Sequence, residues 1–352
     1  MPSLLDPIRI GSLMLPNRVF MSPLTRLRGT EDNIPTPLMV EYYEQRAGAG
    51  LIVTEGVPVD PMGVGYRQVP GVWSQRQVEA WKPITAAVHN AGGHIFMQIW
   101  HVGRISHPMF LHGESPVAPS AIRPQGRVNL VHPVTEFETP RALRTEEVKA
   151  VVEQFRRGAA NAQAAGFDGV EVHGANGYLL DQFLQDGTNQ RTDEYGGSIE
   201  NRARLLLECA DAAASVFGAE RVGMHLAPHS PAHDISDSTP LETFTYVMRE
   251  LRRRRLGFIS VRDPLGPQHL GPALKEAFGG VIVLNEGYTR ETAEEVLERG
   301  EADAVSFGKL FIANPDLPRR FAENAPLNQP VPQTFYAAGA EGYVDYPPLP
   351  EN

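Results

Sequence analysis

The sequence is very poor in cysteine. Of its 352 residues only Cys209 is a cysteine, so no disulfide can form within the chain. Cys209 lies in the apolar face of the helical pattern ENRARLLLECADAAASVF, which predicts a buried structural thiol. Such cysteine usage is typical of a reducing compartment, and we expect a cytoplasmic protein.

Long apolar runs are also missing. No stretch approaches the roughly 20 apolar residues that are needed to span a bilayer. The first ten residues, MPSLLDPIRI, lack the positively charged start and apolar core of an export signal. We therefore expect neither export nor a membrane partner.

Positive charge is in deficit. The chain has 32 Lys and Arg against 42 Asp and Glu, a formal net charge of -10, which argues against binding to nucleic acid or to an acidic membrane. The run from Arg252 to Arg255 does not change this, because it ends a helical pattern just before Gly257. Cations at that place complement the helix dipole and face solvent.

Eight short apolar runs alternate with helical patterns such as Thr145 to Ala165, where we expect Thr145 to cap the helix and Gly166 to end it. Parallel strands need helical crossovers and cover on both faces, so this alternation predicts an α/β fold, a closed (β/α)8 TIM barrel of eight parallel strands. A doubly wound open sheet is the alternative, but no GxGxxG follows the first strand. The eight runs are residues 17–24, 50–56, 93–100, 168–174, 221–228, 257–264, 280–287 and 302–309.

We expect a single barrel domain over residues 1–352, because 42% hydrophobic residues supply a sizeable core and no linker is evident. IRIGSLMLPNRV predicts an N-terminal hairpin that closes the barrel end opposite the site. The longest insertion, residues 105–144 after the third strand, is rich in Pro, Gly and Ser and predicts a lid over the barrel mouth. Residues 325–352 form a C-terminal tail that we expect to pack on the barrel wall.

Three polar side chains follow the predicted strand DGVEVHG. Gly174 and Gly177 let the chain turn sharply, so His173, Asn176 and Tyr178 can converge on one ligand. A histidine beside an asparagine forms a two-donor clamp for a carbonyl oxygen, and a phenol is a weak acid that can deliver a proton. Ordinary turn chemistry is the competing interpretation of HGANGY.

The same stretch continues as HGANGYLLDQFL and NQRTDEYGGSIENRAR, which closely resembles the signature of the Old Yellow Enzyme family of flavin-linked ene-reductases. The resemblance extends over nearly the whole chain. Its further blocks are SPLTR (22–26), QIWHVGR (98–104), SPVAPSAI (115–122), AGFDGVE (165–171), FGKLFIANPDL (307–317) and GYVDYP (342–347).

This resemblance implies a flavin mononucleotide (FMN) across the barrel mouth, reduced by a nicotinamide cofactor, which passes hydride to an activated alkene. By the motif match, Pro23 and Thr25 would lie against the flavin ring and Gln98 would bond its pyrimidine edge. Thr25 and Trp100 would line the substrate pocket.

The resemblance also gives roles to the polar trio. His173 and Asn176 would hold the substrate carbonyl, and Tyr178 would protonate the α-carbon of the alkene.

The chain departs from the family pattern at three positions near the expected flavin. His225 stands where the family usually has an Arg beside the flavin ring, and a near-neutral imidazole cannot replace a fixed cationic fork. Glu286, before Gly287, brings negative charge to the expected phosphate site. Lys309, after Gly308, replaces a bidentate Arg with a point charge. These departures predict that no cofactor is tightly bound.

We therefore expect an enzyme that has lost the flavin and performs a non-redox cyclisation, rearrangement or isomerisation of an apolar, conjugated carbonyl compound of the secondary-metabolite type. The first alternative is an ene-reductase that uses FMN and NAD(P)H, and the second is a non-catalytic barrel that binds a small molecule. A homo-oligomer is compatible with either.

Histidines recur every four residues at His225, His229 and His233, as on one face of a helix. Pro228 and Pro231 break any helix there, so we predict a loop and no metal site.

Overall fold

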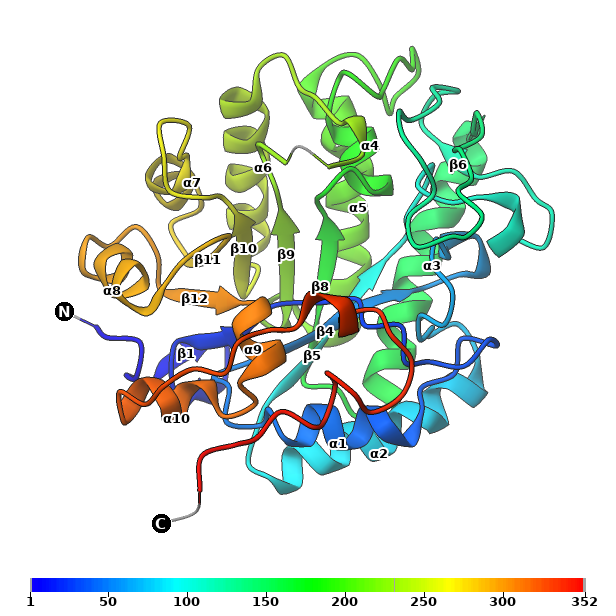
Figure 1. The fold of residues 1–352 in the computed structure, drawn as a ribbon. Coiled ribbons are helices and arrows are strands. Elements are labelled where there is room, and N and C mark those ends of the chain that lie inside the picture. The colour runs from blue at the N-terminus through cyan, green and yellow to red at the C-terminus, as the bar shows by residue number, and fades with distance from the viewer. Residues whose placement is uncertain (1, 231, 351–352) are drawn as a thin grey trace.

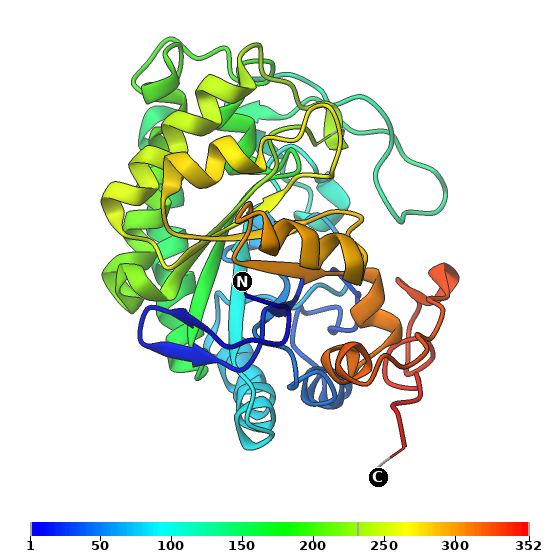
Figure 2. The ribbon, with the colours of Figure 1, turned by 90° about the vertical axis from the view of Figure 1, so that its left-hand side faces the viewer.

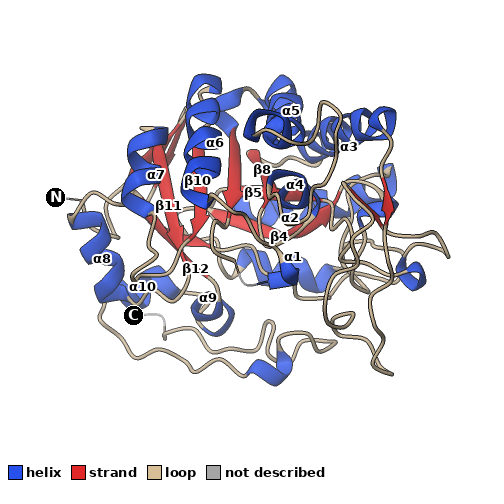
Figure 3. Cartoon of the chain, turned by 90° about the horizontal axis from the view of Figure 1, so that it is seen from above, coloured by secondary structure: helices blue, strands red, loops and turns tan. Residues whose placement is uncertain are grey.

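Eight parallel strands close into a barrel in the computed structural model, which describes residues 2–230 and 232–350 (Figures 1 and 3). Each of the eight apolar runs coincides with one barrel strand, although β4 extends two residues beyond its run, and the predicted (β/α)8 barrel is confirmed. In chain order the strands are β3 (Val19–Met21), β4 (Ile52–Pro58), β5 (Ile95–Trp100), β8 (Gly169–Gly174), β9 (Val222–Leu226), β10 (Phe258–Arg262), β11 (Val281–Asn285) and β12 (Ala304–Phe307).

Helices surround the strands, as the view from above in Figure 3 shows. The main ones are α1 (Pro37–Glu44), α2 (Gln75–Asn90), α3 (Thr145–Ala164), α5 (Ile199–Phe217), α6 (Pro240–Arg254), α7 (Gly271–Phe278), α8 (Arg290–Glu298) and α10 (Leu317–Ala322). Cys209 is buried on α5, as predicted. No helix in the described residues is long and apolar enough to cross a membrane.

Helix α3 is present as predicted, but its first residues differ from the prediction. Buried residues recur along it every three or four positions. The helix ends just before Gly166, whose φ of +91° suits glycine. Thr145, however, does not cap the helix: it is the first helical residue and Arg144 takes the cap position. The Thr145 hydroxyl instead donates to Asp193 Oδ2 at 2.6 Å.

The predicted N-terminal hairpin is formed by the antiparallel strands β1 (Ile8–Ile10) and β2 (Leu13–Leu15). Its apolar side chains pack in one cluster with residues at the beginnings of the barrel strands, among them Phe20, Phe96 and Phe258. The hairpin therefore closes the amino-terminal end of the barrel, away from the insertion (Figure 2).

The insertion between β5 and β8 contains only two short strands, β6 (Val117–Ala118) and β7 (Arg141–Ala142), which pair in parallel. Apolar side chains from its middle, Val128, Val131 and Phe137, share a buried cluster with Trp100 and Tyr178. This packing brings residues 128–137 to the predicted site.

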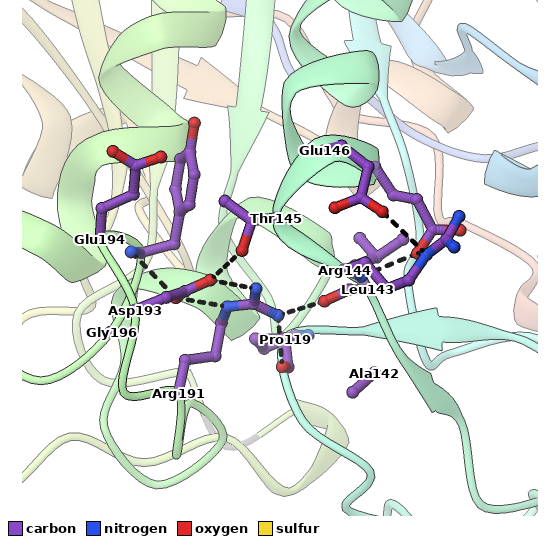
Figure 4. Close-up of polar contacts among 12 residues, drawn as sticks. Pro119, Ala142, Leu143, Arg144, Thr145, Glu146, Arg191, Asp193, Glu194 and Gly196 are labelled. Carbon is purple, nitrogen blue, oxygen red and sulfur yellow. Dashed lines mark hydrogen bonds and ion pairs between the residues drawn. The ribbon is translucent and has the colours of Figure 1, made fainter.

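Hydrogen bonds made by Arg191 and Asp193, here called the clasp, connect the two ends of the insertion (Figure 4). Arg191 donates to the carbonyls of Pro119, at 3.1 Å, and Leu143, and its Nε donates to Asp193 Oδ1 at 2.9 Å. The hydrogen bond from Arg191 holds the pKa of the Asp193 carboxyl well below its usual range. The NQRTDEYGG block thus has a structural role.

The segment after α10, red in Figure 1, runs along the outside of the barrel past α9 (Lys309–Ala313) and packs against α1, where Tyr343 stacks on Tyr42. Three buried arginines, Arg26, Arg28 and Arg46, hold it through backbone carbonyls. Arg26 Nη2, for example, donates to Gly342 O at 2.7 Å. The further acceptors on the tail are Thr334, Phe335, Gly339, Glu341 and Tyr343.

Candidate active site

Polar side chains gather at the carboxyl ends of three adjacent barrel strands. Gln98 lies two residues before the end of β5, and His173 lies one residue before the end of β8. His225 lies opposite His173 on β9, with their ring centroids 5.2 Å apart. Barrels of this kind carry their active sites at this end.

Glu171 accepts hydrogen bonds from the side chains around it in this group. Gln98 Nε2 donates to Glu171 Oε2 at 2.7 Å and lies 3.2 Å from His225 Nδ1, while Ser260 Oγ donates to Glu171 Oε1 at 2.6 Å. An amide nitrogen can only donate, so Nδ1 of His225 accepts and its hydrogen is on Nε2. Burial lowers the pKa of His225 to about 3 and raises the pKa of Glu171 to about 7. His225 is therefore a neutral donor.

His173 is buried without a hydrogen-bond partner. The residue is 4% exposed, and neither ring nitrogen reaches hydrogen-bond geometry with any other described residue. Burial lowers its pKa far below the ordinary value. The backbone of Ala175 lies near the ring and opposes part of that fall, but it does not reach hydrogen-bond geometry with either ring nitrogen. The neutral ring keeps one N–H, and leaving it unpaired in the interior costs free energy. This arrangement indicates a ligand with an acceptor oxygen.

Asn176 lies beside His173 on the turn after β8. Asn176 and Gly177 both have positive φ, 57° and 74°, and a Cβ on Gly177 would come within 2.8 Å of His233 Cβ. Asn176 Oδ1 accepts from Arg262 Nη1 at 2.9 Å and from Ser230 Oγ at 3.3 Å. Its Nδ2 hydrogens are thus left for another acceptor.

Aromatic rings pack against the polar side chains of the site. Trp100 lies edge-to-face against Tyr178, with centroids 4.8 Å apart, and against His173 at 5.8 Å. The Tyr178 hydroxyl is 2.7 Å from the hydroxyl of Tyr66. The sequence motifs did not single out Tyr66, and the available signal was its place in a glycine-containing segment after β4. Burial raises the pKa of Tyr178 well above its ordinary value, so the phenol keeps its proton at neutral pH.

Pro23 and Thr25 are half-buried on the loop after β3. Ser22, at the start of this loop, accepts from Asn285 Nδ2 at 2.9 Å, which ties the loop to the end of β11. The structure therefore places Pro23 and Thr25 at the same end of the barrel as the polar group.

The segments after β11 and β12 follow the seventh and eighth barrel strands, the usual phosphate site of such barrels. Gly287, with φ of 76°, is exposed there, Gly308 is half-buried and Lys309 is exposed. Glu286 does not present a bare charge, because its Oε2 accepts from Arg262 Nε at 2.5 Å. Together with the unpaired ring of His173 and the neutral donor of His225, these groups fit a flavin phosphate and ring.

The three spaced histidines do not share one helix. His225 belongs to β9, and His233 Nδ1 lies 2.6 Å from the backbone oxygen of Asn176. Within residues 2–230 and 232–350, no three His, Cys, Asp or Glu side chains are grouped so that they could hold a metal ion.

A closed barrel of eight parallel strands, with polar side chains gathered at the carboxyl ends of its strands, has the architecture of a (β/α)8-barrel enzyme. Comparison with known sequences then identifies it: residues 3–328 match the NADH:flavin oxidoreductase / NADH oxidase family, and the chain belongs to this family, that of Old Yellow Enzyme.

Its relatives match along nearly their whole length. 12-Oxophytodienoate reductase 1 of Oryza sativa subsp. japonica is 42% identical over 364 residues, covering 99% of this chain and 93% of that protein. Among solved structures, the old yellow enzyme homologue of Zymomonas mobilis has a TM-score of 0.96 at 44% identity, covering 98% of this chain and 99% of that one. Morphinone reductase in complex with tetrahydroNAD has a TM-score of 0.95 at 46% identity, covering 99% and 98%.

The prediction that no cofactor is tightly bound is wrong, because the family is one of NADH:flavin oxidoreductases. The structure gives a physical reason for the error: the carboxylate of Glu286, expected to oppose a phosphate, is paired with Arg262. The comparisons also favour the reductase alternative over a non-redox cyclisation, rearrangement or isomerisation.

Proposed function

We propose that this protein is an FMN-dependent ene-reductase, which uses NAD(P)H to reduce a C=C bond conjugated to a carbonyl group. The observation that carries the proposal is the buried, unpaired ring of His173 beside an Asn176 amide whose oxygen is already occupied. Two unengaged N–H donors, one near the end of β8 and one on the turn that follows it, suit a carbonyl oxygen that gains negative charge during reduction.

The donors act by polarising the substrate. Hydrogen bonds from His173 and Asn176 withdraw electron density from the carbonyl and so make the β-carbon more electrophilic. Burial keeps His173 neutral, so it stabilises the oxygen as a donor and does not protonate it. FMN, when bound, supplies the hydride for the β-carbon.

Tyr178 is placed to complete the reaction. Its phenol is protonated at neutral pH and can donate a proton to the α-carbon. The hydroxyl of Tyr66, 2.7 Å away, can return a proton to Tyr178 after the transfer.

The flavin would be held at two places. Pro23, Thr25, Gln98 and His225 would contact the ring, where Gln98 offers an acceptor oxygen because its nitrogen is engaged by Glu171 and His225. The phosphate would lie at the exposed backbone after β11 and β12, held by Gly287, Gly308 and Lys309.

The substrate is a small, largely apolar compound with a conjugated carbonyl. Thr25 and Trp100 would line its pocket, continued by Tyr66 and the apolar residues of the insertion. Relatives named 12-oxophytodienoate reductase and morphinone reductase support this class of substrate.

The test begins with purified protein incubated with FMN. We expect a flavin absorbance band that NADH or NADPH bleaches without oxygen and that 2-cyclohexenone restores. Tyr178→Phe should leave the bleaching step unchanged and slow restoration by about 10²–10⁴-fold, the range of general acid catalysis. Tyr246→Phe, on the outer helix α6, is the matched control and should behave like the wild type.

Two outcomes would contradict the proposal. The first is a protein that stays colourless after FMN is added. The second is a bound flavin that neither nicotinamide cofactor reduces.

A further inference from the structure

Arg262 is a charged residue at the barrel mouth that the sequence motifs did not single out. It ends β10 two residues after Ser260, and side chains two apart on a strand point to the same face. Because Ser260 bonds Glu171 inside the barrel, Arg262 extends from the inner face at the carboxyl end.

The guanidinium of Arg262 joins two parts of the site. Its Nη1 donates to Asn176 Oδ1 at 2.9 Å and lies 3.5 Å from Ser230 Oγ, and its Nε donates to Glu286 Oε2 at 2.5 Å. Side-chain exposure is 29% for Arg262 and 41% for Glu286, so the pair lies at the edge of the buried site.

These contacts determine which end of the Asn176 amide faces the site. The oxygen and nitrogen of an amide are nearly equal in size, so packing alone discriminates poorly between the two orientations. A guanidinium can only donate, and it therefore selects the orientation with Oδ1 toward Arg262 and Nδ2 toward the site. The opposite orientation would present oxygen to a substrate carbonyl and leave two donors facing each other.

Glu286 in turn fixes Arg262. An arginine side chain is long and flexible, and an acceptor on the neighbouring strand end restricts it. The register pairs Arg262 with Asn285, so Glu286 is close to the base of this side chain.

We propose that Arg262, held by Glu286, is a positioning residue that orients Asn176 as a hydrogen-bond donor to the substrate carbonyl. The role in substrate binding rests on the proposed function. The orientation of Asn176 itself does not require a cofactor.

The orientation can be measured by NMR in protein without added FMN. Asn176→Ala identifies the side-chain amide signals of Asn176 by their disappearance. We expect Arg262→Met to shift those signals, Arg262→Lys to shift them less, and Arg249→Met, on the exposed outer face of α6, to leave them in place. Unchanged Asn176 signals in Arg262→Met would overturn the proposal.

The consequence for binding is measured with FMN-loaded protein and 2-cyclohexenone. Arg262→Met should weaken binding of this carbonyl compound about tenfold, the size of one charge-assisted hydrogen bond. In an Asn176→Ala background the same substitution should have little further effect, because Arg262 acts through Asn176. Glu286→Gln should have an intermediate effect.

The outcomes separate this inference from the proposed function. If the wild type binds FMN and reduces the enone, but Arg262→Met weakens binding equally with and without Asn176, only the positioning role fails. If the wild type takes up no FMN, the proposed function fails, and the NMR comparison alone decides the role of Arg262. A purely structural role would lower the melting temperature of Arg262→Met without moving the Asn176 signals.

Discussion

At the scale of single residues, Glu286 and Arg262 form an ion pair between two strand ends, in which Glu286 Oε2 accepts from Arg262 Nε at 2.5 Å. The sequence alone predicts an unopposed charge at Glu286, because its partner lies 24 residues earlier in the chain. The two meet only because β10 and β11 are neighbours in register, which no local pattern shows. The alternation that puts Ser260 and Arg262 on one face of the strand was the available signal.

Glu286 also has a backbone that favours glycine, with φ of 100°. A non-glycine residue with this backbone conformation is strained by about 1–3 kcal/mol in the folded state. Glycine avoids this strain, but its freer unfolded chain lowers the free energy of unfolding by roughly 0.4–1 kcal/mol. We expect Glu286→Gly to be about 1 kcal/mol more stable to urea than Glu286→Ala. Both substitutions remove the carboxylate, so their difference isolates the backbone term. An alanine variant as stable as the glycine variant would show that the backbone is not strained.

At the scale of elements, strands were easier to predict than their connections. Barrel strands are buried on both faces, so each leaves an uninterrupted apolar run, and all eight runs were found. The pair of β6 and β7 was missed because two-residue strands carry no periodicity. The residue type of Thr145 predicts a helix cap, but its hydroxyl donates to Asp193, a partner distant in sequence.

Asp193 also belongs to the clasp with Arg191 at the base of the insertion. The clasp allows the predicted lid to be tested. In Arg191→Met the carbonyls of Pro119 and Leu143 lose their donor, so residues 117–143 should exchange amide hydrogens faster. Mass spectrometry should detect this while the barrel strands stay protected, and the KM for a bulky enone should change more than the melting temperature. Arg156→Met, an exposed ion-pair residue on α3, is the control. Faster exchange spread evenly over the chain would argue against a local clasp.

At the scale of the whole molecule, the tail and the first barrel segments hold each other in place. Arg26, Arg28 and Arg46 are buried cations, and their hydrogen bonds include backbone carbonyls about 265 to 316 residues along the chain. A buried charge without acceptors is strongly unfavourable, so the tail completes the interior. The sequence showed that a tail existed, but buried arginines could not be told from exposed ones until the fold brought their acceptors together.

Tyr343 is the residue on which this closure can be measured. It is 0% exposed, its ring stacks on Tyr42 with centroids 4.0 Å apart, and the guanidinium carbon of Arg28 lies 4.7 Å from its centroid. Tyr343→Ala should lower the free energy of unfolding by about 3–5 kcal/mol, as for other large buried rings.

Tyr343→Phe separates the ring from the hydroxyl, which is buried without a partner in the described part of the chain. Removing an unpaired polar atom relieves a desolvation cost, so this variant should be at least as stable as the wild type. Urea unfolding of the three proteins provides the comparison. If phenylalanine destabilised the protein as much as alanine, the hydroxyl would have to be hydrogen-bonded. If alanine were harmless, the tail would not complete the interior and the arginines would find other acceptors.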